Sequence, residues 1–154
     1  MAEIRQISGE GEKAEIARRI LEALPEWFGI PEAREEYIRG SSGMPFFAAF
    51  EQKAPVGFLY LSQTGKDTVE LAVIGVRREY HRQGIGRALV AAAKKDALQR
   101  GYSFLQVKTV QMGRYEDYDK TNLFYGALGF KEFEVFPTLW GERNPCQIYV
   151  MALK

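Results

Sequence analysis

The feature that most restricts the fold of this chain is residues 79–89, with the sequence EYHRQGIGRAL. They lie between an apolar, β-branched segment, residues 69–76, and an alanine-rich segment, residues 89–100, whose apolar positions follow a helical period. A strand that enters a helix through a turn directs unpaired N–H groups and the positive end of the helix dipole toward one place. Gly84 and Gly86 allow the dihedral angles of such a turn and leave its backbone accessible. The pattern therefore predicts a turn that binds an anion such as a phosphate.

Two nucleotide-binding motifs are excluded at this turn. A dinucleotide fingerprint needs glycine or alanine three residues after Gly86, where this chain has Leu89. A Walker loop needs Gly-Lys followed by Ser or Thr, and the turn lacks that sequence too. Another nucleotide-binding α/β protein stays an alternative, which the missing third glycine disfavours.

The chain has one cysteine, Cys146, and one histidine, His81. It therefore cannot assemble an internal disulfide or a Cys/His metal cluster, and we expect no metal and a reducing, cytoplasmic location. Its 154 residues suffice for one core, so we expect a single domain over residues 1–154. A formal charge of +1 predicts no general attraction to nucleic acid or to a membrane. No signal peptide or membrane span is predicted, and a homodimer stays open.

Hydrophobic periodicity predicts the element order β-α-α-β-β-β-α-β-α-β-β. Strands are expected over residues 2–7, 44–50, 56–61, 69–76, 103–110, 130–136 and 147–152. Helices are expected from Ser8 or Gly9 to Pro25, over residues 31–40, from the glycine turn to Gly101, and over residues 119–128. Trp27 and Phe28 are expected in a loop, and turns are expected at residues 53–55 and 64–67. This order predicts the α/β class, with a mixed, twisted sheet and helices on both faces.

This order and three motifs resemble the GNAT superfamily of acyl-CoA N-acyltransferases over nearly the whole chain. HRQGIG stands where the family has its Q/R-x-x-G-x-G/A pyrophosphate loop, VELAVIGV resembles its fourth strand, and FYGALGF (residues 124–130) resembles its F/Y-Y-x-x-x-G-F signature. His81 replaces the usual Gln or Arg, and Tyr118 stands where many members have Asn. The resemblance implies transfer of an acetyl group from acetyl-CoA, as co-substrate, to a primary amine by direct attack in a ternary complex.

The resemblance also implies how acetyl-CoA is held. The glycine turn would hold the pyrophosphate, mainly through N–H groups, and His81 would contact a phosphate or cap the turn. The strand before it, around Gly75, would hold the pantetheine arm, and a backbone N–H there would polarise the thioester carbonyl, an effect worth ~3–4 kcal/mol per donor. The alternative is that VELAVIGV is only a buried strand. The implied cofactor residues are Ile74, Val76, His81, Arg82, Gln83, Gly84, Ile85, Gly86, Arg87 and Phe124.

Two side chains are implied to transfer protons. The family places the hydroxyl that corresponds to Tyr125 near the thioester sulfur, so Tyr125 would protonate the departing thiolate; alternatively its ring only packs in the core. Glu70 lies on the strand face of Ala72, Ile74 and Val76, where several members carry a glutamate base. A free glutamate has a pKa of ~4.3, so a base there needs burial, an apolar neighbourhood or a bridging water. The alternative is a solvated carboxylate. Cys146 could accept the acetyl group in a two-step mechanism, but nothing in the sequence supplies a histidine beside it to activate the thiol.

The family binds its acceptor with the loop between its first two helices and the loop between its last two strands. Residues 26–36 contain Trp27, Phe28 and four glutamates against one arginine, and residues 136–146 contain Trp140. Aromatic walls with carboxylates suit a small cationic amine. The alternative for these residues is that the glutamates form a solvated helix face and the tryptophans pack in the core. The alternative functions of the chain are a protein N-terminal or lysine acetyltransferase and a non-catalytic acyl-CoA sensor or interaction domain.

Overall fold

A computed structural model describes residues 2–154 and divides them into two compact units. The N-terminal unit comprises residues up to Ser62 together with Ala72–Asp96, and the C-terminal unit comprises Gln63–Leu71 and Ala97–Lys154. One seven-stranded sheet has the strand order β1-β2-β3-β4-β5-β7-β6, and its strand β4 contributes to both units. Every helix within residues 2–154 is too short or too polar to cross a membrane.

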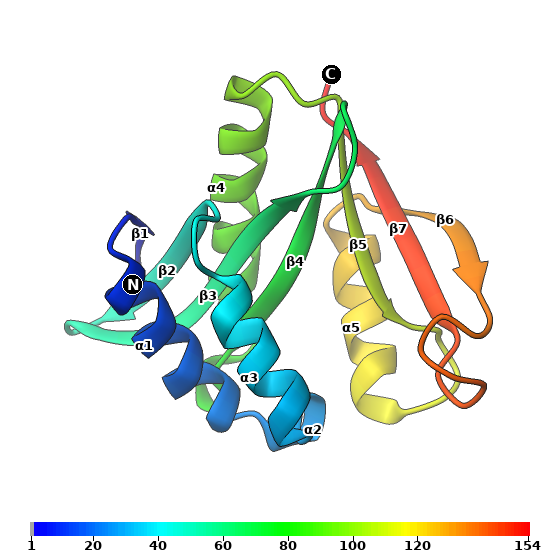
Figure 1. The fold of residues 1–154 in the computed structure, drawn as a ribbon, viewed down its shortest axis with the longest axis horizontal. Coiled ribbons are helices and arrows are strands. Elements are labelled where there is room, and N and C mark those ends of the chain that lie inside the picture. Colours follow the sequence, from blue (N-terminus) through cyan, green and yellow to red (C-terminus); the bar gives the residue numbers. More distant parts are fainter. Residues whose placement is uncertain (1) are drawn as a thin grey trace. The chain divides into compact units, whose positions relative to one another are not determined.

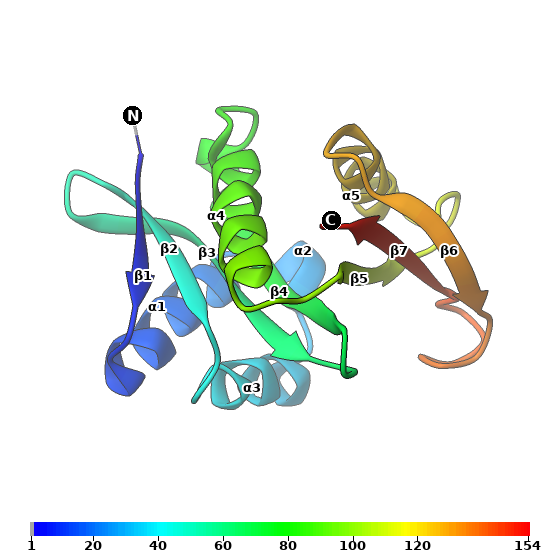
Figure 2. The same cartoon turned by 90° about the horizontal axis from the view of Figure 1, so that it is seen from above.

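The N-terminal unit is an antiparallel sheet with helices on both faces. Its strands and helices are β1 (Glu3–Ile7), α1 (Glu10–Glu22), α2 (Pro25–Phe28), α3 (Pro31–Gly40), β2 (Phe46–Glu51), β3 (Ala54–Gln63), most of β4 (Thr68–Val76) and most of α4 (Ile85–Gln99). Helices α1 and α3 lie on one face of the strands and α4 lies on the other (Figures 1 and 2). Stacked rings of Phe46, Phe58 and Tyr60 pack against the apolar stripe of α1 to form the core.

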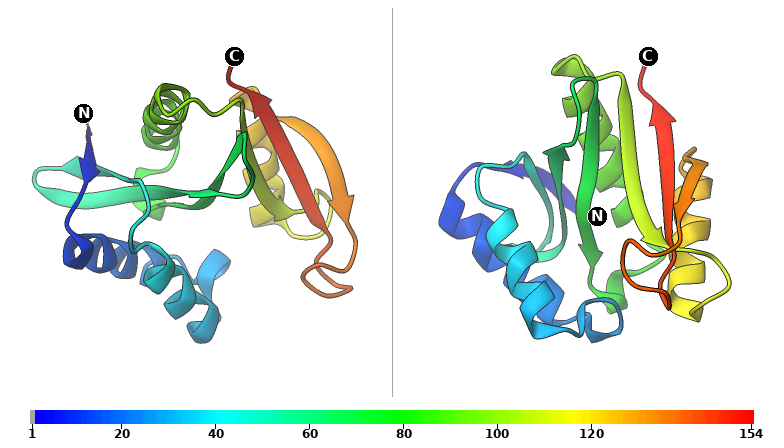
Figure 3. Two further views of the ribbon diagram at one scale, coloured as in Figure 1. Left: turned by 45° about the horizontal axis from the view of Figure 1, so that its top comes forward. Right: turned by 45° about the vertical axis from the view of Figure 1, so that its right-hand side comes forward.

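The C-terminal unit is built around β5 (Phe104–Val110) and β7 (Cys146–Ala152), which pair antiparallel over seven residues. The edge strand β6 (Lys131–Phe136) pairs antiparallel with β7, and α5 (Glu116–Ala127) lies beside these strands (Figure 3). The start of β4 pairs parallel with β5 over three residue pairs, from Thr68 with Phe104 to Glu70 with Gln106. Glu70 is therefore fixed by this ladder.

The predicted fold class and element order are confirmed, with one helix added. The segment with Trp27 and Phe28, predicted as a loop, forms the one-turn helix α2, so this prediction was wrong. Pro25 occupies its first turn, where a fixed φ favours the helix and the missing N–H has no cost. The sequence pattern could not show this because four residues are too few for a helical period.

The hairpin between β2 and β3 was also predicted wrongly. The turn is formed by Gln52 and Lys53, with φ of 49° and 72°, while Ala54 and Pro55 already belong to β3. Two successive positive φ values match the twist of paired strands, but glycine or asparagine usually supplies them, and neither is present here. Pro55 is tolerated at the strand start, opposite a register shift after Ala49.

Candidate functional site

The glycine turn connects β4 to α4 through a short 3₁₀ turn, Arg78–Tyr80. Arg82 and Gly84 have φ of +63° and +82°, and the amide of Ala88 donates to the carbonyl of Gly84 at 3.0 Å, which begins α4. A Cβ built on Gly84 would meet no atom within 4 Å, so the backbone there faces open space. The turn thus needs glycine for its dihedral angle and leaves room for a ligand.

The amides of the turn remain available as donors. Within the N-terminal unit, none of the backbone hydrogen bonds among the described residues is donated by residues 82–87. Arg82, Gln83, Gly84 and Arg87 are exposed, whereas Ile85 is buried and anchors the start of α4. Free N–H groups at the start of a 15-residue helix, with two arginines beside them, fit a pyrophosphate. The donor set therefore suits an anion such as a diphosphate.

His81 directs its ring toward the strand end. Its Nε2 lies 2.7 Å from the carbonyl oxygen of Val76, and its ring meets the ring of Trp27 edge-on with centroids 5.8 Å apart. Val76 and Ile74 are half-buried positions of β4, along which exposure alternates residue by residue. The structure therefore brings together the turn, the end of β4 and helix α2.

Gly75 has a packing role within the N-terminal unit. A Cβ at this position would lie 3.1 Å from Cγ2 of Ile20, which is on α1, and 3.2 Å from Cδ1 of Leu24, which follows α1. These distances are shorter than ordinary van der Waals contacts, so a side chain would push both residues away. Glycine at this position therefore lets Ile20 of α1 and Leu24 pack close to the strand.

Glu70 is held in an ion pair within the C-terminal unit. Its side chain is 13% exposed, and its Oε1 lies 3.0 Å from Lys108 Nζ on β5. Glu70 is thus partly buried beside one cation of the neighbouring strand. Burial raises the pKa of the nearby Cys146 thiol, and the charge of Lys108 offsets part of this rise. The thiol therefore stays protonated and weakly nucleophilic.

Tyr125 lies on α5 and is 4% exposed. Its ring packs edge-on against Phe130 with centroids 5.6 Å apart, and against Phe124 at 5.5 Å and Tyr149 at 6.0 Å. Burial, and the charge of Tyr118 secondarily, raise the pKa of Tyr125 above its ordinary value. The phenol therefore keeps its proton at neutral pH, as a hydrogen-bond donor must.

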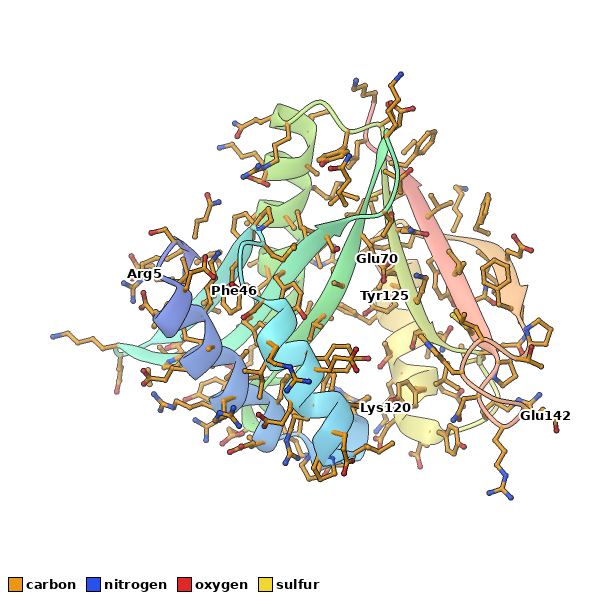
Figure 4. The ribbon with its side chains drawn as sticks, in the orientation of Figure 1. Arg5, Phe46, Glu70, Lys120, Tyr125 and Glu142 are labelled. Carbon is orange, nitrogen blue, oxygen red and sulfur yellow. The ribbon has the colours of Figure 1, made fainter. Side chains whose placement is uncertain are left out.

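The carboxylate of Glu70 and the ring of Tyr125 lie on opposite faces of the C-terminal sheet. Lys108 is opposite Ile148 in the β5–β7 ladder, so Glu70 and Lys108 share the face of Ile148. Tyr149, the next residue of β7, points to the other face, where it meets Tyr125. Figure 4 labels the two side chains on their elements, Glu70 on β4 and Tyr125 on α5.

A buried network that the sequence did not indicate holds α5. Asn122 is 2% exposed, and its amide donates to the carbonyls of Val110 at 2.9 Å and Tyr118 at 2.7 Å. Its Oδ1 accepts a hydrogen bond of 2.6 Å from the hydroxyl of Tyr149. Asn122 and Lys108 were missed because their partners are distant in sequence, and no motif marks either residue.

The residues expected at the acceptor site are divided between the units. Trp27 and Phe28 on α2 are half-buried against the N-terminal core, and Trp140, 42% exposed, belongs to the C-terminal unit. Two of the four glutamates are already paired: Glu26 Oε1 lies 3.1 Å from Arg78 Nη2, and Glu35 accepts two hydrogen bonds from Arg18, at 2.6 and 2.8 Å. These pairs reduce the negative charge open to a ligand.

The described residues hold no group of three or more His, Cys, Asp or Glu side chains arranged to bind a metal ion.

Comparison with known proteins identifies the chain's relatives. The family model described as "Acetyltransferase (GNAT) family" matches residues 14–130. A GNAT-family protein from Desulfovibrio desulfuricans has the same fold with a TM-score of 0.86 and 21% identity, covering 100% of both chains. An aminoglycoside 6'-N-acetyltransferase in complex with coenzyme A has a TM-score of 0.78 and 20% identity, covering 99% of this chain and 97% of its own.

A third structure is the ribosomal-protein-S18-alanine N-acetyltransferase from Escherichia coli, with a TM-score of 0.77 and 21% identity over 100% of this chain and 95% of its own. At these identities the likeness to solved structures establishes the fold. A search of curated protein sequences finds no match.

Proposed function

The chain belongs to the GNAT acetyltransferase family and is an acetyl-CoA-dependent N-acetyltransferase, and we propose that its acceptor is the primary amine of a small cationic molecule. We propose further that residues 1–154 act as one N-acetyltransferase domain. The matched residues 14–130 support this, because they include parts of both compact units. The proposed compartment is the cytoplasm, in keeping with a single, unpaired cysteine.

The observation that carries the proposal is the set of undonated amides at residues 82–87. In the proposed complex these amides, with Arg82 and Arg87, hold the pyrophosphate of acetyl-CoA, and the backbone of Ile74 and Val76 holds its pantetheine arm. Gly84, at φ +82°, gives the turn its shape, and Phe124 lines the cofactor from α5. Acetyl-CoA supplies the activated acetyl group that the acceptor amine receives.

Glu70 is proposed to take the proton from the acceptor amine, directly or through one water. Its partial burial supports this role, because a carboxylate with few competing water molecules accepts a hydrogen bond from the N–H of a bound amine more strongly. Lys108 holds the carboxylate in one position and balances its charge. The positive charge of Lys108 also disfavours an ammonium beside it and so favours the neutral amine, which is the nucleophilic form.

Tyr125 is proposed to donate a hydrogen bond, and then its proton, to the departing thiolate. Because Tyr125 and Glu70 lie on opposite faces of the C-terminal sheet, this role requires the thioester to lie beyond the last β4–β5 pair, Glu70 with Gln106, where the ladder no longer separates the two faces. The phenol is protonated throughout the neutral range, as a hydrogen-bond donor must be. Because burial raises its pKa, it is a weaker acid than a free tyrosine, so its hydrogen bond to the thiolate is better supported than complete proton transfer. The Asn122 network holds the helix that carries it. Direct transfer, without an acetyl-cysteine, agrees with the burial of Cys146 and with the position of the only histidine, His81, in the other unit.

The rings proposed to contact the acceptor are Trp27 and Phe28 in the N-terminal unit and Trp140 in the C-terminal unit. Aromatic rings attract cations, which supports a cationic amine, whereas the pairing of Glu26 and Glu35 leaves fewer free carboxylates than the sequence suggested. Two proteins with this fold act on different acceptor classes: one acetylates aminoglycosides and the other acetylates the alanine of a ribosomal protein. The second candidate function is therefore acetylation of a protein N-terminus or lysine.

Two measurements test the proposal. Isothermal titration calorimetry should detect binding of coenzyme A, and no binding of NAD or ATP. Thiol release from acetyl-CoA is then measured with a polyamine, an aminoglycoside, a free amino acid, a peptide with a free N-terminus and a blocked peptide containing lysine. Small amines should give the fastest release. Turnover with the peptides alone would favour the second function, and binding without release for every acceptor would favour a non-catalytic sensor.

A further inference from the structure

We infer that His81 is a positioning residue that joins the glycine turn to the end of β4 and to helix α2, so that cofactor binding and acceptor binding are coupled. The inference rests on the proposed function, because it concerns the turn that would hold coenzyme A. It gives His81 a role other than the phosphate contact that its place in the motif suggested.

The hydrogen bond to Val76 determines the tautomer of the ring. A carbonyl oxygen only accepts, so the Nε2 atom that lies 2.7 Å from it must carry the proton, and Nδ1 is unprotonated in the neutral ring. Val76 ends β4, and the segment between the two residues is a tight turn in which the amides of Tyr80 and His81 donate to the carbonyls of Arg77 and Arg78. The ring therefore closes this turn against the strand end.

Helix α2 contacts the same turn at two residues. The ring of Trp27 meets the ring of His81 at 5.8 Å with an interplanar angle of 63°. Arg78 lies over the Trp27 ring, with its guanidinium carbon 5.5 Å from the centroid, and pairs with Glu26 at 3.1 Å. The ion pair is largely exposed and contributes little alone, so the ring contacts are the main link between α2 and the turn.

The next residue shows why this link affects the cofactor site. Arg82 has φ of +63°, an unfavourable conformation for a residue with a side chain, which persists only where neighbouring contacts hold it. His81, the residue before it, is held by the contacts with Val76 and Trp27. A ligand that orders residues 82–87 therefore also orders α2, and the effect is reciprocal between the two binding sites.

The tautomer gives a test that needs no activity. The chain has a single histidine, so every imidazole signal in a nitrogen-15 NMR spectrum belongs to His81. We expect the neutral Nε2–H form, retained when coenzyme A is added, and ring proton shifts that change on Trp27→Leu. Phe28→Leu is the matched control, because the Phe28 ring contacts Tyr37. An Nδ1–H tautomer, in which Nε2 has no proton to donate to Val76, would overturn the inference.

Binding measurements test the coupling. His81→Phe keeps a ring beside Trp27 but loses the donor, and should weaken coenzyme A binding by about tenfold and raise the acceptor KM. His81→Gln retains an N–H donor of similar reach and should restore coenzyme A binding. Trp27→Leu should weaken coenzyme A binding as well, and its effect should be non-additive with that of His81→Phe. Unchanged coenzyme A affinity in Trp27→Leu would contradict the coupling.

The two proposals fail in different ways. A wild-type chain that bound no coenzyme A would refute the proposed function, and the inference would then be decided by the tautomer and the Trp27-dependent shifts. Thermal unfolding of each variant shows whether a loss of binding comes from loss of the fold.

Discussion

At the scale of single residues, Glu70 and Tyr125 differ in what surrounds their oxygens. The carboxylate of Glu70 is paired with a cation, Lys108, whereas the described ring contacts of Tyr125 are all with other aromatic rings. A carboxylate oxygen can accept an N–H proton, whereas the phenol, whose pKa burial raises, keeps its proton to donate. This difference is the physical basis for assigning proton removal to one residue and proton donation to the other.

Replacing Tyr125 by Phe should lower kcat by about 100-fold, because it removes only the hydroxyl that would donate to the thiolate. Coenzyme A affinity, measured by calorimetry, should stay within about twofold of the wild-type value, since the ring packing is kept. Tyr115→Phe is the control, an exposed tyrosine immediately before the same helix. Unchanged turnover in Tyr125→Phe would remove this hydroxyl from the mechanism.

Replacing Glu70 by Gln should lower kcat/KM by about 100-fold and flatten the rise of the rate with pH, because the amide cannot accept the proton of the acceptor. The pH–rate profile of each variant is the measurement. Glu132→Gln, on the exposed edge strand, should leave the profile as in the wild type. The base would have to be sought elsewhere if Glu70→Gln retained the wild-type profile.

At the scale of elements, the site depends on how two helices are attached. Helix α4 begins at a turn whose amides are unpaired in the described N-terminal unit, and Gly84 supplies the positive φ. Helix α5 is attached through Asn122, which bonds to the carbonyl that ends β5 and to Tyr149 of β7. The first attachment leaves donors open for a ligand, and the second satisfies every polar atom of one side chain.

Gly84→Ala should destabilise the fold by about 1 kcal/mol, because the new Cβ has space but the φ of +82° is unfavourable for alanine. It should also weaken coenzyme A binding, since the strain is relieved only if the turn changes shape. Gly11→Ala, on α1 with equal space and no positive φ, should instead be neutral or stabilising by at most about 1 kcal/mol. Denaturant unfolding and calorimetry measure both effects, and equal behaviour of the two variants would refute the argument.

Asn122→Ala should destabilise the fold by about 1–3 kcal/mol, because the carbonyl of Val110 and the hydroxyl of Tyr149 lose a buried partner. Leu123→Ala, at an exposed position of the same helix, should stay within about 0.5 kcal/mol of the wild type. Urea unfolding gives both values. A similar midpoint for the two variants would show that the network adds no stability.

At the scale of the whole molecule, buried tyrosines occur in both units. Burial raises the pKa of Tyr60 in the N-terminal unit and of Tyr125 and Tyr149 in the C-terminal unit above the ordinary 10.0. The folded chain thus keeps protons at pH values where the unfolded chain has lost them. The stability that these three tyrosines contribute is fully present below pH 10 and falls as pH rises beyond it.

The melting temperature should therefore decrease as pH rises above the ordinary tyrosine pKa of 10.0, with tyrosinate absorbance increasing as the chain unfolds. Circular dichroism and ultraviolet absorbance, recorded on the same samples, measure the two changes. The control is Tyr115→Phe, which removes an exposed phenol and should leave the transition in place. Full ionisation of the tyrosines in a chain that keeps its folded spectrum would contradict this account.

Much of the fold could be predicted because its signals are local. Apolar residues at helical and strand spacing predicted the element order, and Gly101 and Gly129, with φ of 90° and 102°, follow α4 and α5 as expected. Helix α5 begins at Glu116, three residues before its predicted start, because acidic residues in its first turn favour the N-terminal end of the dipole. Element boundaries depend on such end effects more than on periodicity.

The sequence by itself determined the glycine turn, since a strand–turn–helix is built from consecutive residues and their dihedral preferences. Only the tertiary structure decided what surrounds the reactive groups. Lys108 reaches Glu70 across 38 residues and Tyr149 reaches Asn122 across 27, through strand register and helix docking. Such pairings depend on how the hydrophobic faces pack, and packing energy is a property of the assembled core that no short pattern of residues contains.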